Sequence, residues 1–162
     1  MYAGVPTTPP GNDSELSAAI VGISQTIDPS NAEGYLILGF LALAKDDRIA
    51  ATAAFKKATE LDPASGLAWH NLSAMYLLAK NYDQALFACE RSTVLLPGLQ
   101  GTQLNFGSAL RGMRRYLEAD TAYKKVVSAE PQNADALYNL GILYLDAPAM
   151  PGFDPISQRM IA

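Results

Sequence analysis

The stretch WHNLSAMYLLAKNYDQALFACERSTVLLP, residues 69–97, decides the fold of this chain. Its large apolar residues recur three and four positions apart, which is the spacing of side chains on one face of an α-helix. The stretch ends at Pro97, and proline lacks a backbone N–H and disfavours helical geometry at the residue before it. The pattern therefore predicts a helix that stops at this proline and is followed by a turn.

The pattern repeats along the chain with a fixed period. Four prolines stand at equal intervals, and several other columns of similar residues follow the same interval. The columns are Pro29, Pro63, Pro97 and Pro131; Leu38, Leu72, Phe106 and Leu140; Gly39, Ser73, Gly107 and Gly141; Ala51, Ala85 and Ala119; and Phe55, Cys89 and Tyr123. A period of this length is typical of a solenoid, in which each repeat packs only on its neighbours.

The column of glycine and serine falls in the middle of predicted helices. Glycine there destabilises a helix by about 1 kcal/mol relative to alanine, so a compensating contact is expected. We expect the partner helix to approach closely at this point through the alanine column. The sequence also predicts two helix caps, a capping box of Ser30 with Glu33 and a single cap at Asn133.

These columns resemble the signature of the tetratricopeptide-repeat (TPR) family. That signature places an aromatic residue, a Leu-Gly pair and a tyrosine before an alanine, an aromatic residue, an alanine and a proline. The segments WHNLSAMY (69–76) and LYNLGILY (137–144) carry its first half, and AATAAFKKATELDP (50–63) carries its second half. The resemblance covers residues 14–146 and implies an all-α fold, a right-handed superhelical solenoid of antiparallel helix pairs.

The repeat register divides the chain into seven parts. They are a flexible N-terminal arm (1–13), an N-terminal capping helix or half repeat (14–31), three full repeats (32–65, 66–99 and 100–133), the first helix of a fourth repeat (134–146), and a proline-rich turn with a short C-terminal helix (147–162). The pattern breaks near the end because LDAPAMPGFDP contains three prolines and a glycine. The last helix is predicted to begin at Asp154 and Pro155.

Charge and hydropathy argue against several classes of partner. The chain has 12 Lys and Arg against 16 Asp and Glu, a net charge of −4, so nucleic acid is not expected as a partner. The longest apolar stretch, 35–44, is about half the ~20 residues of a membrane-spanning helix, so direct membrane insertion is not expected. The first residues, MYAGVPTTPP, show no secretory signal. We expect a soluble protein whose compartment the sequence leaves open: cytoplasmic by default, and periplasmic or membrane-complex-associated if a signal has been removed.

Residues suited to catalysis or metal binding are scarce. The chain has one histidine, His70, and one cysteine, Cys89, so a His-Cys metal cluster is not expected. The register puts Cys89 in a column of large apolar residues, which predicts a buried core side chain. No glycine-rich phosphate-binding loop is present in the sequence. We therefore expect no enzyme activity, no cofactor and no bound metal.

One polar column stands directly before the Leu-Gly pairs. It consists of Asn71, Asn105 and Asn139, spaced by the same interval as the prolines. The TPR resemblance implies that the first helix of each repeat lines a concave groove, so the three amides would form a ladder along it. An amide both donates and accepts hydrogen bonds, so the ladder could hold the backbone of an extended peptide. The alternative is that these asparagines tie neighbouring helices together.

Neighbouring positions on the same helices complete the expected groove. Besides the three asparagines, the expected peptide-binding residues are Leu36, Phe40, His70, Leu104, Ser108, Arg111 and Tyr138. In the first repeat Ile37 occupies the asparagine column, and YLILGFLALA (35–44) is apolar on every face. A helix that is apolar all round is normally covered on both sides, so a ligand, the N-terminal arm or a second copy should cover this one.

Some TPR proteins clamp a C-terminal carboxylate with lysine and arginine on these helices. The corresponding positions here are 36, 40, 67, 71, 101 and 105, and none of them holds a basic residue. That subclass is not expected. The sequence instead predicts a non-catalytic scaffold that binds another protein or a peptide in its groove. The alternative is a structural module that forms homo-oligomers through its apolar ends.

Overall fold

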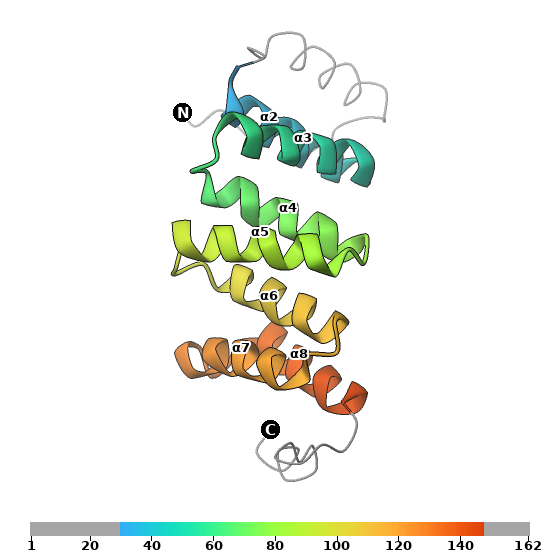
Figure 1. Ribbon diagram of the computed structural model, residues 1–162, viewed down its shortest axis with the longest axis vertical. Coiled ribbons are helices and arrows are strands. Elements are labelled where there is room, and N and C mark those ends of the chain that lie inside the picture. The colour runs from blue at the N-terminus through green and yellow to red at the C-terminus, as the bar shows by residue number, and fades with distance from the viewer. Residues whose placement is uncertain (1–29, 148–162) are drawn as a thin grey trace, which may run out of the picture.

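The computed structural model describes residues 30–147, and in this range the chain forms seven helices (Figure 1). They are α2 (Ala32–Ala44), α3 (Arg48–Leu61), α4 (Gly66–Leu78), α5 (Tyr82–Leu95), α6 (Gln100–Gly112), α7 (Tyr116–Ala129) and α8 (Ala134–Asp146). The N-terminal arm, the helix expected within 14–31 and the C-terminal turn and helix lie outside the described residues.

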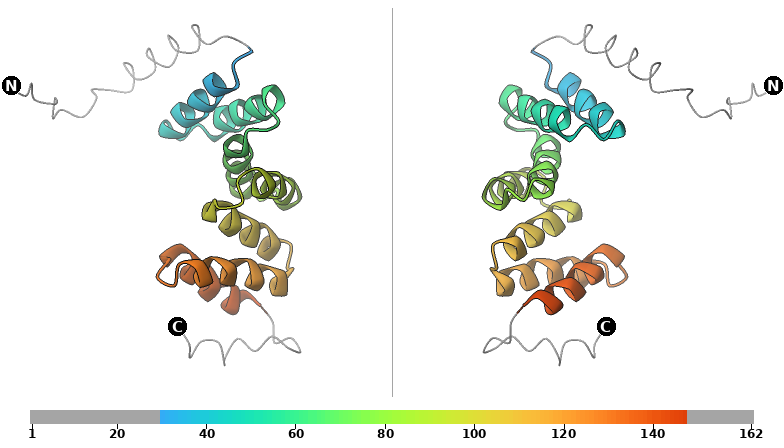
Figure 2. Two further views of the ribbon diagram at one scale, coloured as in Figure 1. Left: turned by 90° about the vertical axis from the view of Figure 1, so that its left-hand side faces the viewer. Right: turned by 90° about the vertical axis from the view of Figure 1, so that its right-hand side faces the viewer.

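The helices pack in sequential pairs, α2 with α3, α4 with α5 and α6 with α7, and α8 follows the third pair. A short turn joins the two helices of each pair, so the second helix runs back alongside the first (Figure 2). The first helices begin at Ala32, Gly66, Gln100 and Ala134, which are evenly spaced and follow the interval of the prolines. The predicted all-α arrangement of stacked helix pairs is confirmed.

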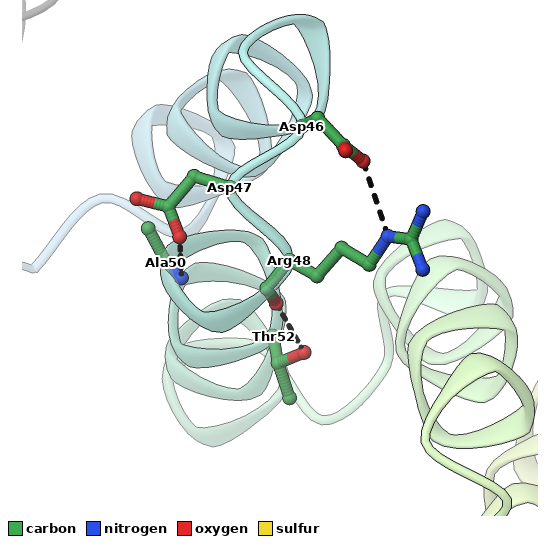
Figure 3. Close-up of polar contacts among 5 residues, drawn as sticks. All are labelled: Asp46, Asp47, Arg48, Ala50 and Thr52. Atoms are coloured by element: carbon green, nitrogen blue, oxygen red, sulfur yellow. Dashed lines mark hydrogen bonds and ion pairs between the residues drawn. The ribbon is translucent and has the colours of Figure 1, made fainter.

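The turns inside the three pairs share one backbone feature. Asp46, Lys80 and Arg114 have φ angles of 55°, 57° and 62°, in the left-handed region that favours glycine. In the first turn the Asp47 carboxylate accepts a hydrogen bond of 2.9 Å from the Ala50 backbone N–H and so caps α3 (Figure 3). The positive φ reverses the chain between the two helices of a pair.

The cap of α2 differs from the expected one. The N-cap residue is Asn31, whose side chain accepts hydrogen bonds from the backbone N–H groups of Glu33 and Gly34. The predicted capping box of Ser30 with Glu33 placed the helix start one residue too early. Asn133 caps α8 as predicted, because its Oδ1 accepts a hydrogen bond of 2.9 Å from the Ala136 N–H.

Two of the glycines inside the first helices make room for aromatic rings of the partner helix. A Cβ atom on Gly39 would lie 2.3 Å from the ring of Phe55, and one on Gly107 would lie 2.5 Å from the ring of Tyr123. Contacts this short are incompatible with a side chain, so only glycine fits against these rings. The expected close approach of the partner helix is confirmed at both glycines. The residues nearest to the glycines are these rings, although Ala51 and Ala119 of the alanine column are themselves buried.

Two apolar clusters form the core of residues 30–147. The first joins α2, α3 and α4 through Ala42, Ala51, Phe55, Leu72 and Met75, and the second joins α6, α7 and α8 through Leu110, Ala119, Tyr123, Leu140, Leu143, Tyr144 and the adjacent Ala147. Between them, Ser73, Ser92 and Thr102 are buried polar residues of α4, α5 and α6. Cys89 is fully buried at this junction, as predicted, and burial raises the pKa of its thiol to about 11.

The stack has an inner and an outer side. Among the first helices, α4 contacts α6 and α6 contacts α8, whereas the second helices α3, α5 and α7 make no comparable contacts with one another in the described range. Helices that lie closer together along a stack mark its concave side. The helices α4, α6 and α8 therefore line the inner face, and we take α2, the first helix of its own pair, as the continuation of this row.

Candidate peptide-binding groove

The three asparagines of the predicted ladder have different partners. Asn71 donates from Nδ2 to the backbone oxygen of Leu67, one turn earlier in α4, at 2.8 Å. Asn105 donates from Nδ2 to Ser73 Oγ on α4 at 3.0 Å, so it ties two repeats together. Asn139 is half-buried and has no hydrogen-bond partner within residues 30–147. Of the two roles considered for this column, the helix tie is therefore observed for Asn105 alone.

His70 lies beside these asparagines and joins a chain of hydroxyl groups. Its Nδ1 is 3.0 Å from Thr102 Oγ1 on α6, which is 3.0 Å from Ser92 Oγ on α5. Ser92 Oγ donates in turn to the backbone oxygen of Gly66 at 2.9 Å. Burial lowers the pKa of His70, because a half-buried imidazole is harder to charge. The ring is thus a neutral, fixed part of the inner face near pH 7.

Apolar side chains are exposed at both ends of the row of first helices. Phe40 on α2 keeps 44% of its surface exposed, while the edge of its ring packs against Phe55 at a centroid distance of 5.4 Å. Ile37 is 51% exposed, and Tyr138 on α8 is 69% exposed. Leu36 and Leu104 are half-buried and pack against the first and second core clusters, respectively. The apolar sequence of α2 predicted that a partner covers this helix. Among the described residues, none covers the exposed part of Phe40.

Two predicted groove residues are occupied by contacts within the fold. Ser108 Oγ lies 3.0 Å from the hydroxyl of Tyr123, and Arg111 forms an ion pair with Asp146 on α8. Arg111 Nε is buried without a hydrogen-bond partner among the described residues. These side chains fasten α6 to α7 and α8. Neither of them offers a free charge to a ligand.

The hydroxyl residues of this junction were missed by the sequence analysis. Ser73, Ser92 and Thr102 hold Asn105 and His70 in place. Of these three, Ser73 alone was considered from the sequence, and its column was interpreted as packing. The signal that could have revealed them is a hydroxyl group at a position where other repeats have glycine or alanine. Ser73 stands where the other repeats have glycine, and Thr102 stands where α4 and α8 have Ala68 and Ala136.

A second concave feature lies on the outer side, among α3, α4 and α5. It is a cavity of about 460 Å³ whose apolar lining includes Trp69, Leu72, Tyr76 and Phe87. Trp69 donates from Nε1 to the backbone oxygen of Pro63 at 3.0 Å, and its ring packs edge-on against Phe87. Trp69 is therefore a half-buried wall of this cavity and does not belong to the inner face.

The described residues contain no group of three or more His, Cys, Asp and Glu side chains that could hold a metal ion. Within the same range, none of the helices has the length and apolar character needed to cross a membrane.

Comparison with known families matches three parts of the chain to models described as tetratricopeptide repeat. The matched parts are residues 32–65, 54–87 and 104–153. A curated relative, small glutamine-rich tetratricopeptide repeat-containing protein 2 of Mycosarcoma maydis, is 31% identical over 106 residues. The alignment takes in 65% of this chain, which spans only 30% of that relative's length.

Solved structures with the same fold cover most of the chain. MamA is similar with a TM-score of 0.74 and 24% identity, over 82% of this chain and 78% of that one. The second TPR domain of human RPAP3, solved in complex with the HSP70 peptide SGPTIEEVD, has a TM-score of 0.63 and 20% identity. That match covers 70% of this chain and 98% of the RPAP3 domain. At these identities the likeness shows the fold alone.

Proposed function

Because the chain belongs to the tetratricopeptide-repeat family, we propose that it is a non-catalytic scaffold that binds an extended peptide or a partner protein on its inner face. The proposed contact residues are those expected from the sequence that still have free surface or free polar atoms. They are Leu36, Phe40, His70, Asn71, Leu104, Asn105, Tyr138 and Asn139.

The observation that carries this proposal is the exposed apolar surface at the two ends of the row of first helices. Phe40 and Tyr138 keep 44% and 69% of their surface exposed, with the polar groups of α4 and α6 between them. Aromatic side chains are enriched at protein–protein interfaces and often anchor the partner there. The RPAP3 domain, which has the same fold, was solved with a peptide bound.

The test is the affinity of a partner, captured with the wild-type protein and identified by mass spectrometry, for purified variants. Asn71→Ala combined with Asn139→Ala leaves the Asn105 tie intact and removes two amides. Each lost hydrogen bond should contribute about 0.5–1.5 kcal/mol, so binding should weaken about tenfold. Phe40→Ala should also weaken binding, and Lys56→Glu on the outer side is the control that should not. Unchanged affinity in both inner-face variants would rule out this surface.

A second candidate is self-assembly through the exposed end of the stack. On α8, Leu145 is 68% exposed, and a Cβ on Gly141 would meet no atom within 4 Å. The equivalent glycines, Gly39 and Gly107, each face a ring of the following helix. Light scattering coupled to size exclusion separates the two candidates, because a concentration-independent dimer or larger species would favour assembly and a monomer would favour the binding scaffold.

A further inference from the structure

The direction of one hydrogen bond on the inner face follows from chemistry alone. The oxygen that Asn71 contacts is the backbone carbonyl of Leu67, and a carbonyl oxygen can only accept. The amide nitrogen of Asn71 must therefore face it. This leaves the Asn71 Oδ1, an acceptor, without a partner in the described part of the chain.

The orientation of Asn105 is fixed in the same way. Ser73 Oγ lies 2.6 Å from the backbone oxygen of His70, so the single hydroxyl proton of Ser73 is committed to that oxygen. Towards Asn105, Ser73 can then only accept, which requires the amide nitrogen at this contact of 3.0 Å. The Asn105 Oδ1 is the atom left without a partner among residues 30–147.

The tautomer of His70 is set by the row of hydroxyl groups. Ser92 donates its proton to the Gly66 oxygen, so it accepts from Thr102, and Thr102 in turn accepts from His70. This is the one proton arrangement that fills all three contacts. The proton of the neutral ring is therefore on Nδ1. Nε2 carries a lone pair, reaches solvent and has no partner in the described residues.

The unpaired charges on the same face are negative, which favours a hydrogen-bond donor that carries positive charge. Glu33 and Asp135, in the column that also holds Leu67 and Gly101, are exposed and form no ion pair in the described range. Arg111 is the basic residue among the proposed groove positions, and Asp146 already neutralises it. A carboxylate brought to this surface would therefore meet acceptors and negative charge.

We propose that the inner face selects a basic segment of its partner, whose lysine or arginine side chains donate to Asn71 Oδ1, Asn105 Oδ1 and His70 Nε2. This rests on the proposed function and names the chemistry of the ligand. Three acceptors suit ammonium and guanidinium groups, which are donors only, and the described groove positions hold no cation besides the paired Arg111. The same arrangement disfavours an acidic C-terminal peptide of the kind bound in the RPAP3 complex.

The free protein provides a direct test of the proton arrangement, because the chain contains one histidine. A two-bond ¹H–¹⁵N spectrum of the untagged protein at pH 7.5 should show the Nδ1–H tautomer. Thr102→Val, which removes the acceptor with little change of shape, should move the ring towards the Nε2–H form. An Nε2–H ring in the wild-type protein would overturn the proposal without any binding measurement.

Binding is tested with three labelled peptides that share one Leu-Ala framework. One carries three lysines and a C-terminal amide, one carries three glutamines and the amide, and one carries three glutamates with a free carboxylate. In fluorescence anisotropy the lysine peptide should bind about tenfold tighter than the glutamate peptide. Glutamate binding that equals or exceeds lysine binding would overturn the donor preference and leave the proposed function standing. A dissociation constant of ~1 mM is weak for a specific site. If none of the three peptides binds at that protein concentration, both the donor preference and the proposed function are contradicted.

A matched variant separates site recognition from the attraction of any cation to a protein of net charge −4. Asn71→Leu removes the acceptor without changing the net charge, so the preference for the lysine peptide over the glutamine peptide should shrink about fivefold. Asn71→Asp keeps the acceptor and adds charge, so lysine binding should tighten. A lysine preference that is unchanged by Asn71→Leu would mean that net charge alone attracts the peptide, which contradicts the proposal.

Discussion

Gly107 lies directly beneath the ring of Tyr123, so closely that a Cβ atom would come within 2.5 Å of it. We expect Gly107→Leu to lower the free energy of unfolding by about 2–4 kcal/mol, because a large side chain would force the two helices apart. Gly141 is the matched control, since a Cβ there meets nothing within 4 Å. Gly141→Ala should stabilise α8 by about 0.5–1 kcal/mol. Urea denaturation measures both, and a neutral Gly107→Leu would contradict the observed packing.

The left-handed residues in the turns predict a stabilising substitution. Lys80 has a φ of 57°, which is unfavourable for a residue with a Cβ and free of strain for glycine. Lys80→Gly should therefore raise the free energy of unfolding by about 0.5 kcal/mol. Lys56→Gly, in the middle of α3, should lower it by about 1 kcal/mol. Equal losses at both positions in thermal denaturation would argue against the left-handed turn.

Asn105 and Asn71 should differ in their effect on the free energy of unfolding when each is replaced alone. Asn105→Ala breaks a half-buried bond between repeats and leaves Ser73 with one partner fewer, so it should reduce stability by about 1 kcal/mol. Asn71→Ala removes an exposed bond to its own helix and should change stability by less than about 0.5 kcal/mol. Chemical denaturation of the two proteins is sufficient. Equal effects would mean that Asn105 does not tie α6 to α4.

Stability should fall on mild acidification because of His70. Burial lowers the pKa of the folded imidazole below its ordinary value of 6.5, whereas the unfolded ring keeps that value. Below pH 6.5 the unfolded state therefore binds more protons than the folded state, and stability is lost as pH falls through this value. Melting temperatures between pH 7.5 and 5.5 should decrease in the wild-type protein and less in His70→Gln. A flat wild-type profile would contradict the burial of the ring.

The repeat, the helix pairs and the inner face could be predicted because they depend on periodic residue types. A column of prolines and a column of glycines with one shared interval mark helix ends and close contacts whatever the detailed packing. Which residue fills the space beside Gly39 was not predictable, because Phe55 and Ala51 lie one helical turn apart and both are buried. Asn31 in place of Ser30 at the start of α2 is a one-residue ambiguity between two good capping residues.

The polar junction was harder to predict for a physical reason. Ser73, Ser92 and Thr102 lie on three different helices, and their hydrogen bonds form only after α4, α5 and α6 have stacked. A sequence column shows that a residue is small, but it does not show where a hydroxyl proton goes. The direction of these bonds, on which the donor preference of the inner face depends, required coordinates.

The most direct test of peptide binding on the inner face is to map the bound ligand by NMR. The lysine peptide is titrated into ¹⁵N-labelled protein, and the amide shifts of each helix are followed. We predict that the largest changes lie on α2, α4, α6 and α8, around Phe40, Asn71 and Tyr138, with α3 and α7 nearly unaffected. Changes confined to α3 and α5, around Lys56 and Phe87 in the outer cavity, would show that the ligand binds on the other side of the solenoid and would contradict the central claim.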